Sequence, residues 1–183
     1  MLKKVFLMGT AAALATGVAC ASSAPYIGAS LGILNNTVNK NSTAFGNYRG
    51  MPVNVFVGYG ALLSQSFYLA GELTGTLVTA ELMNNGSMKS TYGYGASLLP
   101  GYMLGDTTLA FVRAGVVRTR YTSLNTTQTG GQFGFGMQTS LTQSVDLRSE
   151  YDFAPYRSIT TASGISASPR ADVFSVGLVY HFD

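Results

Sequence analysis

The last twelve residues of the chain, DVFSVGLVYHFD (172–183), alternate strictly between two kinds of side chain. One set is aromatic or aliphatic, whereas the other is mostly small or polar; the first set comprises Phe174, Val176, Leu178, Tyr180 and Phe182. Successive side chains of a β-strand point to opposite faces, so this stretch predicts a strand with two unlike faces. The alternation recurs to give eight predicted strands, over residues 26–34, 51–60, 67–77, 92–103, 108–118, 132–141, 145–153 and 172–182. Each is close to the ~9–11 residues that a tilted strand needs to cross a membrane.

Charged residues are too few for a soluble domain of this size. Asp, Glu, Lys and Arg make up 10% of the 183 residues, whereas soluble domains contain about 25%. Beyond the first 21 residues, no apolar run approaches the ~20 residues that a membrane helix needs. Strands that present an apolar side chain to lipid at every second position satisfy both observations. The sequence therefore predicts an all-β protein, an eight-stranded antiparallel up-and-down transmembrane β-barrel.

The start of the chain has the features of an export signal. Residues 1–21 combine two lysines, an Ala-rich apolar run and a small-x-small cleavage site at 19–21. We expect cleavage after residue 21, which leaves a single barrel domain over 22–183. Lipidation at Cys20 is the alternative, although Gly17 stands where lipoprotein signals have Leu. Cys20 is the only cysteine, so the mature barrel has no internal disulfide.

The connections between the predicted strands alternate in length. Short ones fall at 61–66, 104–106 and 142–144, and long polar ones at 35–50, 78–91, 119–131 and 154–171. Outer-membrane barrels have short periplasmic turns and longer extracellular loops. The pattern predicts four longer extracellular loops at one end, with both chain ends at the short-turn end because the strand number is even.

A set of charges is expected inside the barrel. Along 145–153 every charged side chain falls on one face of the strand, and Glu72 and Arg113 lie on the Gly- and Ser-rich faces of theirs. An isolated charge in a narrow lumen is costly, so we expect Glu72, Arg113, Arg148 and Glu150 to pair as carboxylate–guanidinium bridges. They could form a structural plug or a gate whose partner exchange opens a water path. The plug is favoured because eight-stranded barrels fill their interior with side chains.

Basic residues gather at the long-connection end, namely Lys40, Arg49, Lys89, Arg118, Arg120, Arg157 and Arg170. Such a rim suits the phosphates of lipopolysaccharide, which Arg can bind with two hydrogen bonds. Acidic host polymers such as sulfated glycans are a second partner, and plain solvation of the basic groups is equally open. Nucleic acid is not expected, because these residues would face the cell exterior and form no compact motif. Aromatic residues near strand ends are expected to form interfacial girdles; they are Tyr26, Tyr59, Phe67, Tyr92, Tyr102, Phe153, Tyr180 and Phe182.

Three stretches, VRAGV (112–116), SEYDF (149–153) and FSVGLVYHF (174–182), resemble the small bacterial outer-membrane barrels grouped with opacity proteins, adhesion barrels and surface antigens. The resemblance implies a monomeric or weakly associated barrel in the outer membrane of a Gram-negative bacterium. It implies that the assembly machinery reads Phe182, which Asp183 follows here. The motifs themselves do not assign one function. Because the polar loops stand on a rigid scaffold, we expect them to act as an adhesin-like, antigenic binding surface, and the barrel to contribute to membrane integrity.

Two other functions stay open from the sequence. A porin-like channel for small solutes is suggested by the Gly-rich lumen faces, and a lipid-modifying enzyme by the size of the barrel. Enzymes of this kind use a His with Ser or acidic partners, but the single His181 is expected at the short-turn end, near no carboxylate except that of Asp183. With no second His and no Cys cluster, we expect no metal site, no cofactor and no enzymatic activity.

Overall fold

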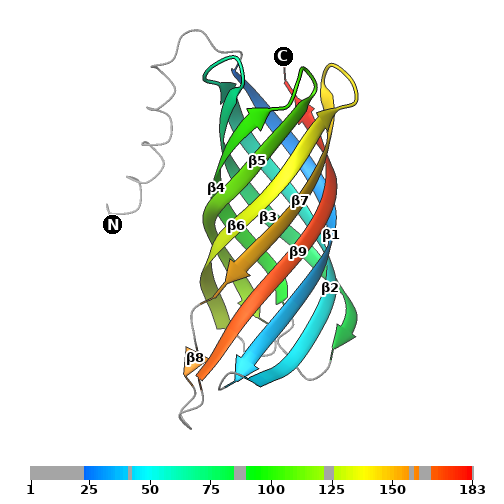
Figure 1. Cartoon of the computed structure of the whole chain (residues 1–183). Helices are drawn as coiled ribbons and strands as arrows, with labels where there is room; N and C mark the ends of the chain where they lie inside the picture. Colours follow the sequence, from blue (N-terminus) through cyan, green and yellow to red (C-terminus); the bar gives the residue numbers. More distant parts are fainter. Residues whose placement is uncertain are drawn as a thin grey trace, which may run out of the picture.

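The computed structural model describes residues 23–40, 43–84, 90–121, 126–156, 159–160 and 166–182. Its strands are β1 (Ser23–Lys40), β2 (Thr43–Leu62), β3 (Phe67–Asn84), β4 (Ser90–Met103), β5 (Thr108–Tyr121), β6 (Thr126–Ser140), β7 (Val145–Pro155), β8 (Ile159–Thr160) and β9 (Ser166–His181). Figure 1 shows the strands winding, strongly tilted, around a common axis. The described residues include no helix that is long and apolar enough to cross a membrane.

The strands form a closed antiparallel barrel. Strands β1 to β7 pair in chain order, β9 follows β7, and β9 pairs back with β1. The closing ladder runs from Tyr26 opposite His181 to Lys40 opposite Ala167. The two-residue β8 pairs only with β9 and stands outside the ring. The predicted eight-stranded barrel is therefore confirmed, and its closure leaves no row of unpaired backbone groups facing lipid.

Three short turns lie at the end of the barrel where β1 begins and β9 ends, at the top of Figure 1. They cover residues 63–66, 104–107 and 141–144, within two residues of the predicted turns. Backbone hydrogen bonds close them, such as Leu104 N to Thr108 O at 2.7 Å and Leu141 N to Val145 O at 2.9 Å. Gly105 has a φ of 83°, a backbone conformation that is strained for other residues.

The long connections are shorter than predicted. Most of the loop expected over 35–50 is strand, because β1 continues to Lys40 and β2 begins at Thr43. The loops expected over 78–91, 119–131 and 154–171 are likewise shortened by strands that continue past the apolar segments. Outside a membrane the outer face of a strand meets water, so Asn- and Thr-rich stretches keep the backbone ladder but lose the apolar alternation. The barrel wall therefore extends beyond its apolar band.

Inward and outward faces alternate along most of the wall as expected; where the register between β2 and β3 shifts, the adjacent Leu77 and Val78 are both exposed. On β9 the aromatic and aliphatic set from Phe174 to Tyr180 is exposed, whereas Ser175 and Val179 are buried. The exposed apolar side chains form a band around the outside; in its middle Leu73 is 61% exposed. A soluble protein rarely exposes so large a continuous apolar surface, whereas a membrane barrel requires it.

Aromatic side chains fill the half of the lumen that lies nearer the short turns. We call the short-turn end of the barrel its inner end and the opposite end its outer end. The aromatic side chains lie over glycines of neighbouring strands: a Cβ added at Gly28 would collide with the Phe56 ring, and one added at Gly58 with the Tyr26 ring. The girdle position predicted for Tyr26 is wrong, because this side chain is buried in the lumen at 1% exposure. Its inward direction follows from its being two residues from the inward-facing Gly28 on the same strand.

Candidate functional sites in the lumen and at the outer rim

Glu72, Arg113, Arg148 and Glu150 lie together across the middle of the lumen, and we call them the central charge layer. Alternation along β3, β5 and β7 turns each of them inward. Glu72 accepts hydrogen bonds from Arg113 Nη2 at 2.7 Å on Oε1 and from Arg148 Nη1 at 2.6 Å on Oε2. Arg113 also donates to both carboxylate oxygens of Glu150, with Nη2 to Oε2 at 3.0 Å. All four side chains are at most 6% exposed.

Glu72 is the centre of this layer. Besides the two guanidinium groups, its carboxylate accepts the phenol hydroxyl of Tyr26 at 2.9 Å and the hydroxyl of Thr74 at 3.4 Å. A buried carboxylate that accepts several hydrogen bonds, two of them from cations, is compensated for its loss of hydration. The layer therefore ties β1, β3, β5 and β7 together across the barrel.

Arg148 is held by aromatic rings as well as by charge. Its Cζ atom lies 4.6 Å from the ring centroid of Phe56, 5.2 Å from that of Phe111 and 5.4 Å from that of Tyr26. A guanidinium group surrounded in this way gains cation–π attraction in addition to its ion pair. Its Nε atom donates to Gln138 Oε1 at 2.9 Å.

A polar chain continues from Gln138 toward the short-turn end. Gln138 Nε2 donates to Asp146 Oδ2 at 2.6 Å, and His181 Nε2 lies 2.9 Å from the same oxygen. The expectation that no carboxylate other than that of Asp183 lies near His181 is therefore wrong. The antiparallel pairing of β7 with β9 places Asp146 beside Val179, which brings its side chain within reach of His181.

The central layer separates two cavities. The outer one has a volume of about 100 Å³ and reaches down to Arg113, Arg148 and Glu150. The inner one has a volume of about 230 Å³ and is bordered by Gln138 and His181. Between them the lumen is filled by side chains such as Tyr26, which is almost fully buried. This geometry supports the plug over an open gate.

Four arginines project outward beyond the apolar band at the outer end, and we call them the arginine belt: Arg49 on β2, Arg118 and Arg120 on β5, and Arg170 on β9. Arg118 is directly opposite the exposed Tyr94 of β4. Arg170 lies over the ring of Phe153, with 4.3 Å between Cζ and the ring centroid, and pairs with Asp172 at 3.0 Å. No ion pair involves Arg49 or Arg118 within the part of the chain that the structure describes.

Other rim residues lie outside what the structure describes. Lys89, Arg157 and the side chain of Lys40 are among them. Phe182 is described at the end of β9, where its ring is 46% exposed and its backbone N–H donates to Pro25 O at 3.0 Å. Its reading by the assembly machinery stays a prediction.

The sequence indicated the charge layer but not all of its partners. Asp152 was expected on the lumen face but not as a partner of the layer, where it lies 3.5 Å from Arg113. Tyr26 and Gln138 were not expected there, and their place two residues from other inward positions was the available signal. Within the described residues, no group of three His, Cys, Asp or Glu side chains could hold a metal ion.

Comparison with known proteins agrees with this geometry. Residues 5–182 match the family model described as outer membrane protein beta-barrel domain. The structure resembles neisserial surface protein A, with a TM-score of 0.56, 16% identity, and coverage of 86% of this chain and 97% of that one. It also resembles Ail, the attachment invasion locus protein of Yersinia pestis, solved with the heparin analogue sucrose octasulfate (TM-score 0.50, 12% identity, coverage 86% and 99%). The search of curated proteins found no match. The chain belongs to the outer membrane protein β-barrel domain family and is a protein of the bacterial outer membrane.

Proposed function

We propose that the protein is a surface barrel whose outer end is an adhesin-like binding platform and whose arginine belt holds it among lipopolysaccharide molecules. The observation that carries the proposal is the position of the belt. On β2, Arg49 is the next lipid-facing position beyond the exposed Met51 in the direction of the outer end. On β5, Arg118 is the next such position beyond the exposed Val116. Guanidinium groups directly outside the apolar band are at the depth of lipid headgroups, where phosphate is the principal anion.

The binding platform is supported by the length of the strands. Because β1, β2 and β3 have 18, 20 and 18 residues, the wall continues well past the length needed to cross a membrane. Loops held on a rigid scaffold are the usual place for binding residues. The platform would present its connecting loops clear of the headgroups.

The two alternatives receive less support from the geometry. A porin-like channel needs a continuous water path, but the central charge layer and the rings around Arg148 fill the lumen. A lipid-modifying enzyme needs a nucleophile and base at the lipid surface of the outer end, whereas His181 lies at the short-turn end.

Neutralising the belt tests the lipid contact. The triple variant Arg49→Gln, Arg118→Gln, Arg120→Gln is expected to reduce the stability that the barrel gains in lipopolysaccharide-containing bilayers by about 1 kcal/mol per arginine. The measurement is the temperature at which the compact barrel unfolds on a denaturing gel, in bilayers with and without lipopolysaccharide. In phosphatidylcholine alone, where each phosphate is balanced by its own choline group, the variant and the wild type should unfold at nearly the same temperature. If lipopolysaccharide raised the unfolding temperature of both proteins equally, the proposed contact between the arginine belt and lipopolysaccharide would be wrong.

Shortening the loops tests the platform. Replacing residues 85–89 and 122–125 by two-residue Asn-Gly turns should lower the adherence of expressing cells to surfaces coated with sulfated glycan by roughly tenfold or more. Sucrose octasulfate, the ligand in the Ail complex, serves as the soluble competitor. The matched control replaces the short turn 104–107 at the opposite end and should leave adherence unchanged. Full adherence of a loop-shortened, properly folded barrel would refute the platform.

A further inference from the structure

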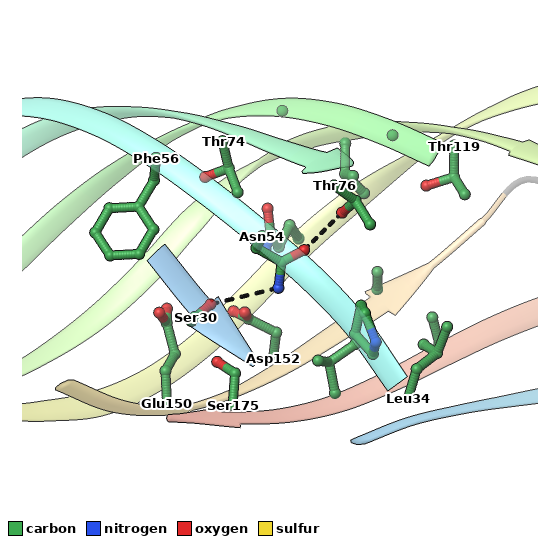
Figure 2. A pocket seen from close by; sticks show the side chains of 18 of the residues that line it. Ser30, Leu34, Asn54, Phe56, Thr74, Thr76, Thr119, Glu150, Asp152 and Ser175 are labelled. Carbon is green, nitrogen blue, oxygen red and sulfur yellow. Dashed lines mark hydrogen bonds between the residues drawn. The ribbon is translucent and has the colours of Figure 1, made fainter. Parts of the chain in front are cut away.

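The outer cavity of the lumen has charged groups at its inner end, and aliphatic side chains together with Thr and Asn further out. Figure 2 shows Phe56 and Glu150 at one end of the cavity and Leu34 and Thr119 at the other. Between them Asn54 donates to Ser30 Oγ at 3.5 Å and accepts from Thr76 Oγ1 at 2.8 Å. The volume of the cavity, about 100 Å³, has room for several water molecules, and hence for a small organic molecule.

The charges at the inner end of this cavity do not balance. Three carboxylates, on Glu72, Glu150 and Asp152, face two guanidinium groups, on Arg113 and Arg148. Both arginines already bind Glu72 or Glu150 at short distances. The third carboxylate therefore has no guanidinium group that it does not share with another carboxylate.

Asp152 is that third carboxylate, and it borders the cavity. Its nearest cation is Arg113, with Nε 3.5 Å from Oδ1, a guanidinium group that also binds Glu72 and Glu150. Its Oδ1 atom is fully enclosed and accepts no hydrogen bond from any described residue, whereas the side chain as a whole keeps 16% of its surface exposed at the cavity. A Cβ added at Gly134, directly opposite on β6, would collide with this oxygen, so the glycine makes room for the carboxylate.

The outer wall suits a short hydrocarbon chain. Leu34, Val117 and Val173 border the cavity on the side away from the charge layer. A divalent metal ion would need six or more oxygen ligands, and its double charge would be repelled by the nearby guanidinium groups twice as strongly as a single charge. An ammonium group needs fewer partners, because its three donors can be shared between one carboxylate and neutral oxygens such as those of Asn54 and Ser30.

We propose that the outer cavity binds a small primary alkylammonium ion, with its ammonium group at Asp152 and its carbon chain against Leu34, Val117 and Val173. The ligand enters from the outer end, because the filled middle of the lumen blocks the route from the short-turn end. Its positive charge balances the third carboxylate, and its chain replaces water along the apolar wall.

Calorimetric titration of the purified barrel in detergent with n-butylammonium chloride tests the site. We expect saturable binding that n-butanol, which has the same chain without the charge, does not reproduce. Asp152→Asn should weaken binding by about tenfold or more, since a charge-assisted hydrogen bond becomes a neutral one. The control Asp172→Asn alters an outward carboxylate of β9 and should bind as the wild type does.

A second variant keeps the test decisive if Asp152→Asn does not fold, as judged by mobility before and after boiling. Val117→Phe fills the cavity and leaves Asp152 in place, so it should abolish binding in a closed barrel. Retained binding by either folded variant would overturn the proposal, and so would the absence of saturable binding by the wild type. Displacement of n-butylammonium by an equal concentration of sodium would assign the cavity to an inorganic ion and overturn the organic ligand.

Discussion

Replacing Glu72 by alanine is expected to lower the free energy of unfolding of the barrel by about 3–5 kcal/mol. The substitution removes the carboxylate that accepts hydrogen bonds from Arg113, Arg148 and Tyr26. It leaves Arg148 without its ion pair in a site where that side chain is only 5% exposed. A buried charge without its counter-ion must be hydrated, neutralised or expelled, and each of these opens the packed centre of the lumen.

The measurement is the urea midpoint of unfolding in detergent micelles, for the wild type and Glu72→Ala. Glu81→Ala is the matched control on the same strand, where the side chain is exposed, and it should change stability by no more than about 0.5 kcal/mol. A midpoint for Glu72→Ala equal to that of the wild type would mean that water already hydrates the layer, and the structural plug would be wrong.

Replacing Leu73 by arginine is expected to destabilise the barrel in a lipid bilayer by about 2–4 kcal/mol. Leu73 follows Glu72 directly on β3, yet its side chain points outward and is 61% exposed, in the middle of the apolar band. In a soluble protein, so exposed a side chain could become arginine at almost no cost. In a membrane the guanidinium group would have to enter hydrocarbon.

The control for this second prediction is the same substitution at a different depth in the membrane. Ala80 is also exposed on β3 but lies nearer the outer rim, opposite Met51. Ala80→Arg should destabilise the barrel by only about 0–1 kcal/mol, because a charge at the interface reaches water. Both variants are compared with the wild type by unfolding in phosphatidylcholine bilayers. Equal effects of the two substitutions would contradict the assignment of the apolar band to the membrane core.

The two predictions concern neighbouring residues with opposite surroundings, and the reason lies in the period of the strand. Glu72 and Leu73 are adjacent in the chain but lie on opposite faces of the wall. A slip of one residue in pairing would exchange the two faces, placing the carboxylate in lipid and the leucine among arginines. The charge layer therefore helps to specify the register of β3 as well as its stability.

Rules of local patterning account for what the sequence determined. The period of two along 145–153 places Arg148 and Glu150 on the face opposite Leu147, and the same rule applies to Glu72 and Arg113. Scarce charge and alternation together required lipid outside and polar groups inside. Short turns were also recognisable, because a tight connection leaves few residues between two apolar segments. Strand ends were not recognisable at the outer rim, where both faces meet water and the pattern that marks a strand disappears.

Only the tertiary structure decided which inward side chains meet. Contacts across the lumen depend on the tilt of the strands and on the stagger between them, which no single segment encodes. Glu72 and Arg148 are 76 positions apart in the chain and still bond at 2.6 Å, whereas Asp152, two residues after Glu150, keeps an oxygen without a hydrogen bond. Alternation along the chain thus determined which residues face the lumen. The closure of the barrel, by setting the height of each strand against the others, determined which of them pair closely and which one keeps an oxygen without a hydrogen bond.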